Sequence, residues 1–223
     1  MTEPRLTVVF DLDGTLVDSA RDFVPILNRL LAGDGLAPIS YSQVGHVVGQ
    51  GAAKMIERAF ELRNIGLSSD RIKTLIGEFL ADYEANTSNE TVFYDGVLDC
   101  LDEMQRRNWN LAICTNKFRH LAVKLLTEMD VAERFTCITG GDTFDTKKPD
   151  PKHLTETVKL SGGDVKNALI VGDSINDILA GQRAEIPQIA VDFGYSDCPV
   201  SDLNPSRVIS HFRELIPAIQ SLK

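Results

Sequence analysis

The sequence predicts an α/β protein: a Rossmann-like, mainly parallel sheet with a small all-helical cap domain inserted after its first strand. Three patterns lead to this fold class. Residues 8–10 form a short apolar run, long enough for one buried strand, which ends abruptly at Asp11. Residues 18–86 then show apolar side chains at helical spacing and no convincing strand. From residue 97 onward, helical patterns alternate with short apolar runs, which is typical of a parallel sheet with right-handed crossovers.

The composition is that of a globular protein and argues against several classes of partner. The 223 residues are 43% hydrophobic and 25% charged, which is ordinary, and they suffice for one large domain or two unequal ones. A net charge of −9 without any basic block argues against nucleic acid and anionic membranes as partners. An anionic substrate would therefore need a local cluster of cations or a metal.

Nothing in the chain predicts secretion or a membrane span. No basic segment followed by an apolar stretch opens it, and no apolar run approaches the roughly 18 residues of a spanning helix. The four cysteines have no C-x-x-C spacing and are interpreted as reduced thiols: Cys100, Cys114, Cys137 and Cys198. We therefore expect a cytoplasmic protein, monomeric or homodimeric, whose partner is a small molecule.

Three amphipathic segments make up the predicted cap. The first covers residues 18–31 and contains Pro25, so the helix either starts close to this residue or is kinked there. Gly33-Asp34-Gly35 ends it. The second segment covers 52–60, and the third, 72–83, has the cleanest apolar stripe of the chain. Because these segments leave the sheet directly after its first strand, they are placed to form a lid.

The rest of the chain alternates between helix and strand. Helices are predicted near residues 97–104, 121–129, 154–158, 178–179 and 212–219. Strands are predicted at 110–116, 135–139, 168–171 and 188–191, with a further edge strand at 208–209. Ligands of such sheets bind at the carboxyl ends of the strands. The polar residues that follow the apolar runs therefore form the candidate site.

Carboxylates follow two of the predicted strands. Asp11 and Asp13 come after the first, and they project the same way because successive strand residues point to opposite faces. Two like charges this close are costly unless a cation neutralises them, and oxygen ligands are what Mg²⁺ prefers. Asp173 follows another strand and could converge on the same ion. The hydroxyl of Thr115 and the charge of Lys148 would complete the set that phosphoryl transfer needs.

On these residues the chain resembles the haloacid dehalogenase superfamily of phosphohydrolases. The four motifs of that superfamily occur in order, as Asp11-Leu12-Asp13-Gly14-Thr15, Thr115, Lys148, and Gly172-Asp173 with Asp177. The resemblance covers nearly the whole chain. It implies a haloacid dehalogenase-like core domain of residues 1–17 and 87–223, and a cap domain of residues 18–86 that matches the helical cap of the superfamily's first cap class.

Within the superfamily the chain looks most like the phosphoglycolate phosphatases. Three segments carry this closer resemblance: Gly140-Gly141-Asp142-Thr143, Lys147-Lys148-Pro149-Asp150-Pro151 and Val171-Gly172-Asp173-Ser174. The resemblance implies a Mg²⁺-dependent phosphatase that hydrolyses a small phosphomonoester, with 2-phosphoglycolate as the first candidate.

The resemblance also implies a role for each catalytic residue. Asp11 would be the nucleophile that takes the phosphoryl group as an aspartyl-phosphate. Asp13 would protonate the leaving oxygen and then activate the water that hydrolyses this intermediate. Thr115 would hydrogen-bond the transferring phosphoryl oxygens, and Lys148 would neutralise them.

A magnesium site follows from the same resemblance. Mg²⁺ would be held by Asp11, by the backbone carbonyl of Asp13, and by Asp173. Asp177, one helical turn later, would orient these ligands without binding the ion itself. The four histidines lack metal-ligand spacing, and we assign them to surface or packing roles: His46, His120, His153 and His211.

Substrate recognition is expected both at the strand ends and in the cap. Thr115, Asn116 and Lys148 would bind the phosphoryl group. Gly51 belongs to the segment Gly49-Gln50-Gly51 before a predicted helix, where backbone N–H groups could face an anion. Lys54 could meet a substrate carboxylate, although a solvated helix face explains this lysine equally well.

Several alternatives stay open at this level. A β-phosphoglucomutase-like enzyme shares Asp11 and Asp13 but returns the phosphoryl group to a sugar. A pyrophosphatase or a phosphonatase of the same superfamily is a further alternative, and a phosphonatase would need a Schiff-base lysine in the cap, for which Lys54 is a candidate. A non-catalytic receiver domain also uses acidic residues, Thr and Lys around Mg²⁺, but it would lack the long helical insertion. Dehalogenases are disfavoured, since they need no acid at the position of Asp13.

Overall fold

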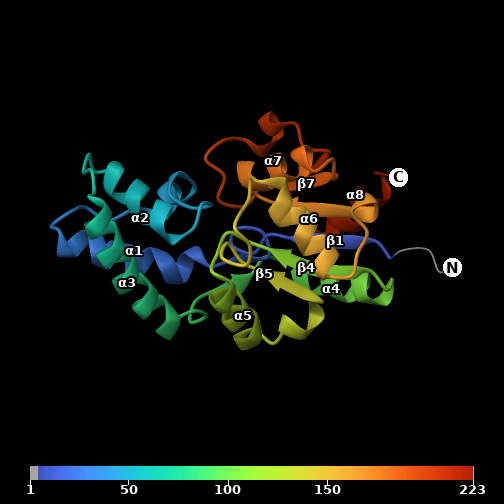
Figure 1. Cartoon of the computed structure of the whole chain (residues 1–223), viewed down its shortest axis with the longest axis horizontal. Helices are drawn as coiled ribbons and strands as arrows, with labels where there is room; N and C mark the ends of the chain where they lie inside the picture. Colours follow the sequence, from blue (N-terminus) through green and yellow to red (C-terminus); the bar gives the residue numbers. More distant parts are fainter. Residues whose placement is uncertain (1–4, 223) are drawn as a thin grey trace.

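Six parallel strands form the central sheet of the protein, within the larger lobe at the right of Figure 1. In this computed structural model, which describes residues 5–222, the strand order is β5-β4-β1-β6-β7-β8. The strands are β1 (Thr7–Phe10), β4 (Asn110–Cys114), β5 (Cys137–Thr139), β6 (Ala168–Gly172), β7 (Gln188–Val191) and β8 (Arg207–Ile209). All their pairings are parallel, which confirms the predicted fold class, and β8 is the edge strand expected near its position.

The first strand lies in the middle of the sheet. Phe10 of β1 pairs with Ile113 of β4 on one side and with Val171 of β6 on the other. All residues of these three strands are buried, as expected for a parallel sheet covered on both faces, and this explains why each strand is a continuous apolar run. Because β1 is paired in this register with both β4 and β6, the polar residues that follow the three strands lie together at one edge of the sheet.

Helices cover both faces of this sheet. On one face, Val8 and Phe10 pack in a cluster with residues of α4 (Val97–Arg106), α5 (Arg119–Glu128) and α8 (Leu215–Gln220). On the other face, Val9 packs with residues of α6 (Pro151–Leu160) and α7 (Ile175–Arg183). Short 3₁₀ turns complete the core at Ala132–Arg134, Val165–Asn167, Val200–Leu203 and Phe212–Glu214. Among the described residues, none of the helices has both the length and the apolar character needed to cross a bilayer.

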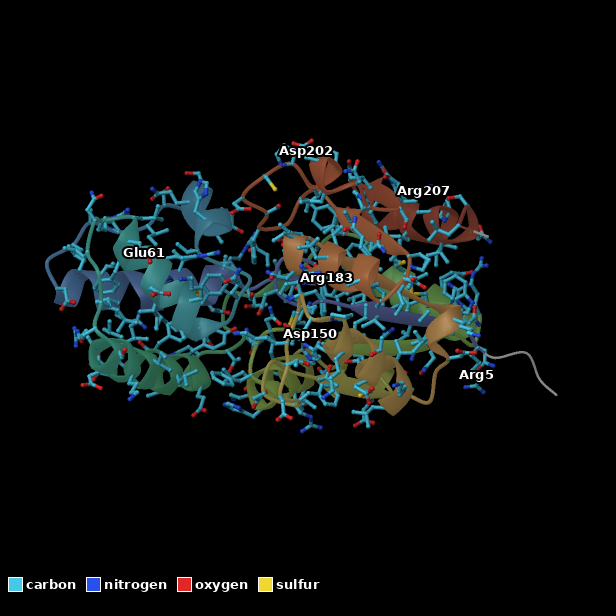
Figure 2. The ribbon with its side chains drawn as sticks, turned by 45° about the horizontal axis from the view of Figure 1, so that its top comes forward. Arg5, Glu61, Asp150, Arg183, Asp202 and Arg207 are labelled. Atoms are coloured by element: carbon cyan, nitrogen blue, oxygen red, sulfur yellow. The ribbon has the colours of Figure 1, made fainter. Side chains whose placement is uncertain are left out.

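The second lobe is the helical cap, at the left of Figure 1. It contains α1 (Ala20–Gly33), a 3₁₀ turn (Tyr41–His46), α2 (Ala52–Glu61) and α3 (Ser69–Ala85), all inside the predicted range 18–86. Helix α1 runs through Pro25 without ending there. The three helices bury their apolar faces against one another, and two core residues, Leu121 and Tyr195, belong to the same cluster. Figure 2 shows both lobes with their side chains, with Glu61 on the cap and Arg183 on the core.

A short antiparallel ribbon joins the two lobes. It pairs β2 (Val17–Asp18), where the chain enters the cap, with β3 (Val92–Phe93), where it returns to the core. Sequence periodicity missed this ribbon, because strands of two residues are too short to show alternation. The paired strands hold the entry and exit of the cap side by side, next to the carboxyl end of β1.

Candidate active site

Asp11 and Asp13 leave the end of β1 and line one pocket between core and cap. The N–H of Asp11 donates to the carbonyl of Val171 at 2.9 Å, so the pairing with β6 extends to this residue. The chain then turns, with the N–H of Val17 donating to the carbonyl of Leu12 at 3.2 Å. Leu12 is fully buried while both carboxylates face the pocket, as the alternation along the strand predicts.

A glycine is required where this turn passes the neighbouring strand. Gly14 has a φ of +83°, and a Cβ at this position would lie 2.4 Å from Oδ2 of Asp173. Asp173 directly follows β6, and its carboxylate accepts hydrogen bonds from Thr15 Oγ1 at 2.9 Å and from the N–H of Tyr195 at 2.7 Å. The missing side chain of Gly14 thus lets the turn close tightly over Asp173.

Lys148 places a buried positive charge among these carboxylates. Its side chain is 1% exposed, and Nζ lies 3.0 Å from Oδ1 of Asp11 and 2.6 Å from Oδ1 of Asp177. Burial alone would lower the pKa of Lys148, but the two carboxylates outweigh burial and raise this pKa above its usual range. The ammonium group therefore remains charged beside Asp11.

Asp177 lies in the first turn of α7, and both of its oxygens have protein donors. Oδ2 accepts from the N–H of Ser174 at 3.1 Å and from its hydroxyl at 2.7 Å, while Oδ1 accepts from Lys148. Ser174 is the N-cap of the helix, so Asp173 is not needed as a cap. Asp177 therefore holds Lys148 in place, and its expected role in orienting the metal ligands stays a prediction.

The three buried aspartates form a cluster that fits a hard divalent cation. Carboxylate oxygens of Asp11, Asp173 and Asp177 all lie within 4.8 Å of one another. Burial raises the pKa of Asp173, and the charges of Asp177 and Asp11 raise it further. Burial also raises the pKa of Asp11, against the opposing effect of Lys148. A cation would keep these carboxyl groups ionised, and oxygen-only donors suit Mg²⁺, with Asp11 and Asp173 as its side-chain ligands.

Thr115 and Asn116 follow β4 at the same edge. Both residues line the pocket with the two carboxylates, and the side chain of Asn116 also reaches into the cap. Its Nδ2 donates to the carbonyl of Gly49 at 2.9 Å and to the carbonyl of Lys148 at 2.9 Å. Asn116 therefore links the cap loop to the loop that carries the buried lysine.

The cap side of the pocket is almost entirely apolar. The cap contributes six apolar side chains, Phe23, Val48, Ala52, Met55, Phe79 and Leu80, together with the backbone at Gly49 and Gly51. The one polar cap side chain that lines the pocket is Tyr83 of α3, within the part of the chain described, residues 5–222. Apolar cap side chains thus cover the two carboxylates, and this wall has few groups that could form hydrogen bonds with a ligand.

Lys117 lies between this apolar wall and the carboxylates of Asp11 and Asp13, and it lines the same pocket. Its Nζ lies 3.0 Å from Oδ1 and 3.2 Å from Oδ2 of Asp13, and it donates to the hydroxyl of Tyr83 at 2.7 Å. The hydroxyl of Ser19 donates to the same carboxylate at 2.5 Å. Burial would lower the pKa of Lys117, but Asp13 and Tyr83 outweigh it and raise this pKa. The Asp13 carboxylate is therefore held in place by donors from the core and from the start of the cap.

The family to which the chain belongs follows from comparison with known proteins. The sequence pattern of the haloacid dehalogenase-like hydrolases matches residues 8–191. The chain belongs to this family. A relative from Agrobacterium fabrum, named phosphoglycolate phosphatase, is 46% identical and covers 95% of this chain and 91% of its own length. Another of the same name, from Mesorhizobium japonicum, is 42% identical and covers 95% of this chain and 93% of its own length.

A solved structure supports the same assignment. The crystal structure of a predicted phosphoglycolate phosphatase from Haemophilus somnus 129pt matches this haloacid dehalogenase-like hydrolase with a TM-score of 0.88 and 28% identity. The match covers 97% of this chain and 98% of the other. The predicted family and the predicted enzyme class, a phosphoric monoester hydrolase, are confirmed by these comparisons.

The structure of this hydrolase brings most of the predicted site residues together. Asp11, Asp13, Thr115 and Asn116 line one pocket, with Lys148, Asp173 and Asp177 directly behind Asp11. Gly51 also lines the pocket, at the start of α2. The place of the Asp13 backbone carbonyl in the metal site stays a prediction.

Lys54 is the predicted site residue that lies apart from the others. It does not line the pocket, its side chain is 39% exposed, and its Nζ pairs with Glu57 of the same helix at 2.5 Å. The structure thus gives the solvated helix face that was weighed against substrate binding, and among residues 5–222 no cap lysine lines the pocket. The neighbouring loop instead contacts the core through its carbonyls, with Lys147 Nζ donating to Gln50 at 2.8 Å.

Sequence reasoning missed Lys117, Tyr83 and Tyr195. Lys117 follows Thr115 and Asn116, so its position in a polar run at the end of a strand was the available signal. Tyr83 was recognised only as part of an apolar stripe. Tyr195 contacts Asp173 through its N–H, and its hydroxyl donates to Asp18 at 2.7 Å. Nothing in the sequence reveals such links, because they depend on where the cap sits.

Proposed function

We propose that this hydrolase converts 2-phosphoglycolate and water into glycolate and inorganic phosphate, through an aspartyl-phosphate on Asp11 and with Mg²⁺ as cofactor. The observation that carries the proposal is the placement of Asp11 and Asp13 on the floor of one pocket, with Lys148 3.0 Å from the first and Lys117 3.0 Å from the second. Relatives named phosphoglycolate phosphatase, 46% and 42% identical over 95% of the chain, support the choice of substrate.

In the first step, a carboxylate oxygen of Asp11 attacks phosphorus, and the bond from phosphorus to the glycolate oxygen breaks. Asp13, in its protonated form, gives its proton to that leaving oxygen. The ammonium of Lys148 lies where it can balance the charge of the transferring group, and the Thr115 hydroxyl lines the same pocket. Glycolate can then leave, with the phosphoryl group on Asp11.

In the second step, Asp13 acts as a base. Its carboxylate takes a proton from a water molecule, the water oxygen attacks phosphorus, and the bond from phosphorus to Asp11 breaks, which releases inorganic phosphate. Ser19 and Lys117 orient the Asp13 carboxylate for both proton transfers. The apolar wall of the cap keeps other water molecules away from the intermediate.

Asp11 and Asp173 would hold the Mg²⁺, with Asp177 and Lys148 fixing their orientation. When bound, Mg²⁺ supplies positive charge that stabilises the phosphoryl oxygens. Uncatalysed hydrolysis of phosphate monoesters is extremely slow, so preorganised charges must supply a barrier reduction of about 20 kcal/mol or more. We also propose a cytoplasmic location, which the four free cysteines support, and a small phosphorylated metabolite as the only ligand besides the metal.

The test is phosphate release by the purified protein with Mg²⁺ over a panel of 2-phosphoglycolate, sugar phosphates, nucleotides and pyrophosphate. We expect the highest kcat/KM for 2-phosphoglycolate and no turnover after chelation of the metal. A preference for pyrophosphate would overturn the substrate, and isomerisation of a sugar phosphate without phosphate release would point to the phosphoglucomutase-like alternative. An aspartyl-phosphate that persists for minutes to hours would favour a phospho-acceptor over an enzyme.

The Asp11→Asn variant tests the nucleophile. We expect it to fold, because the amide keeps the shape of the side chain, and to show no phosphate release. Acid quenching of the wild-type reaction, followed by mass spectrometry, should place the phosphoryl group on Asp11. Substantial turnover by the variant would contradict this assignment.

A further inference from the structure

The pocket has an unusual distribution of polar groups above the catalytic carboxylates. Of the described residues that line it, Lys117 is the only cation, and Tyr83 is the only polar side chain from the cap. Both are buried: the side chain of Lys117 is 8% exposed, and Tyr83 is 2% exposed. A ligand portion that extends from Asp13 toward the cap therefore meets one positive charge, one hydroxyl and an apolar wall.

The two residues form a pair that joins the lobes. Lys117 follows β4 of the core and Tyr83 lies in α3 of the cap, yet Nζ and the hydroxyl oxygen are 2.7 Å apart. The ammonium also lies 4.5 Å from the centre of the Tyr83 ring. The pair therefore links the cap to the core in this structure.

Both residues keep hydrogen-bonding capacity for a ligand. The Tyr83 hydroxyl accepts from Lys117, and no acceptor for its own proton is found among residues 5–222. Burial raises the pKa of Tyr83 to about 12, so the hydroxyl keeps this proton. An ammonium group has three N–H donors; if one of them is shared between the two oxygens of Asp13 and a second bonds to Tyr83, the third is left for a ligand.

The chemistry of the proposed substrate places an anion at this pair. In 2-phosphoglycolate, one methylene group separates the ester oxygen from the carboxylate carbon. If Asp13 protonates that oxygen, the carboxylate lies within reach of a cation that itself contacts Asp13, as Lys117 does. The apolar surroundings strengthen such a charge-assisted contact, because little water competes there.

We propose that Lys117 and Tyr83 together bind the carboxylate of the substrate and so select short, anionic leaving groups. The inference rests on the proposed function and deepens it by naming the residues that recognise the substrate. Sugars and nucleosides are disfavoured, since their hydroxyl groups would be buried against the cap without partners. Because the two residues come from different lobes, the substrate's carboxylate also favours the closed cap.

The experiment compares two substrates that differ in the carboxylate alone: 2-phosphoglycolate and ethyl phosphate. For each variant we measure kcat/KM on both and take the ratio, which cancels effects on the chemical step. In Tyr83→Phe, which preserves the ring and its packing, we expect this ratio to fall about 10- to 100-fold, the loss that accompanies one hydrogen bond to a charged group. In Lys117→Met we expect a larger fall.

Tyr41→Phe is the matched control. It also removes one phenolic hydroxyl in the cap, but Tyr41 is 54% exposed, bonds to Asp18 and does not line the pocket. The ratio of kcat/KM on the two substrates should be the same in Tyr41→Phe as in the wild type. If Tyr83→Phe and Lys117→Met keep the wild-type ratio, the inference is wrong while the proposed function stands. If the wild type itself hydrolyses 2-phosphoglycolate no better than ethyl phosphate, the proposed substrate is wrong.

Discussion

Lys148 lies behind the pocket and forms an ion pair with Asp11, with Nζ 3.0 Å from Oδ1. The same ammonium contacts Asp177 at 2.6 Å, so one cation faces two buried carboxylates. Removal of one partner from such a group leaves an uncompensated buried charge. We therefore expect the ion pair to contribute to the stability of the protein as well as to the proposed reaction.

Lys148→Met should abolish phosphatase activity and lower the free energy of unfolding in the presence of chelator by about 3–5 kcal/mol. Mg²⁺ should stabilise this variant more than the wild type, because the ion then replaces the missing charge. Urea unfolding with and without Mg²⁺ measures both effects. Lys152→Met, at an exposed position of α6, is the control and should behave as wild type. A Lys148 variant as stable as wild type in chelator would refute this account.

Gly14 fits beneath Asp173 only because it has no side chain. In Gly14→Ala, the new Cβ would lie 2.4 Å from Oδ2 of Asp173, at a φ of +83°. We expect the carboxylate to be displaced, with weaker Mg²⁺ binding and about a 100-fold loss of kcat/KM. Isothermal titration with Mg²⁺ and phosphate release measure the two effects.

Gly35→Ala separates the clash from the backbone strain. Gly35 also has a positive φ, +70°, but a Cβ there would meet no atom within 4 Å. This control should lose only about 1–2 kcal/mol of stability and keep its Mg²⁺ affinity. If both variants bind Mg²⁺ equally well, close approach to Asp173 is not what Gly14 provides.

Asp22 ties the cap to the segment just before β3, the returning strand of the ribbon. Its buried carboxylate accepts from the N–H groups of Glu90 and Thr91, both at 2.9 Å, and from the Thr91 hydroxyl at 2.6 Å. Asp22→Ala leaves these donors without a partner and should cost about 2–4 kcal/mol of stability. Hydrogen exchange at Glu90 and Thr91 should accelerate. The control is Asp70→Ala, because Asp70 is an exposed aspartate in the first turn of α3. This variant should change neither the stability nor the hydrogen exchange at Glu90 and Thr91.

The positions of the candidate catalytic residues could be predicted because they follow from the topology of a parallel sheet. Asp11, Thr115 and Asp173 each come after a buried apolar run, and parallel strands end at the same edge. A pattern along the chain was sufficient to place them near one another. The role of Lys148, on a loop between strands, needed the family resemblance in addition, since Lys147 precedes it.

Features that depend on the position of the cap could not be predicted. Lys54 and Tyr83 lie on different cap helices, and which of them faces the core depends on how each helix is rotated about its axis. That rotation is set by packing within the cap, where the apolar stripes of the three helices meet. As a result, the residue expected in the pocket points to Glu57, and the residue assigned to packing reaches Lys117.

His153 gives the protein a pH-dependent stability apart from catalysis. The ring is fully buried, packs edge-on against Phe144, and its Nδ1 accepts from the N–H of Lys148 at 3.2 Å. Burial, assisted by the charge of Lys148, lowers the pKa of His153 from 6.5 to about 4. Between these values the unfolded chain binds a proton that the native state does not, so stability must fall as the pH falls through this range.

Because of this one residue, we expect the free energy of unfolding to be about 2 kcal/mol lower at pH 5 than at pH 7. His153→Gln removes the titrating ring and should reduce the difference in unfolding free energy between these pH values by that amount, whatever its effect at pH 7. Urea unfolding at both pH values measures it. His120→Gln, at an exposed ring, is the control and should keep the wild-type difference. An unchanged difference in His153→Gln would mean that the buried carboxylates, rather than this ring, dominate the acid response.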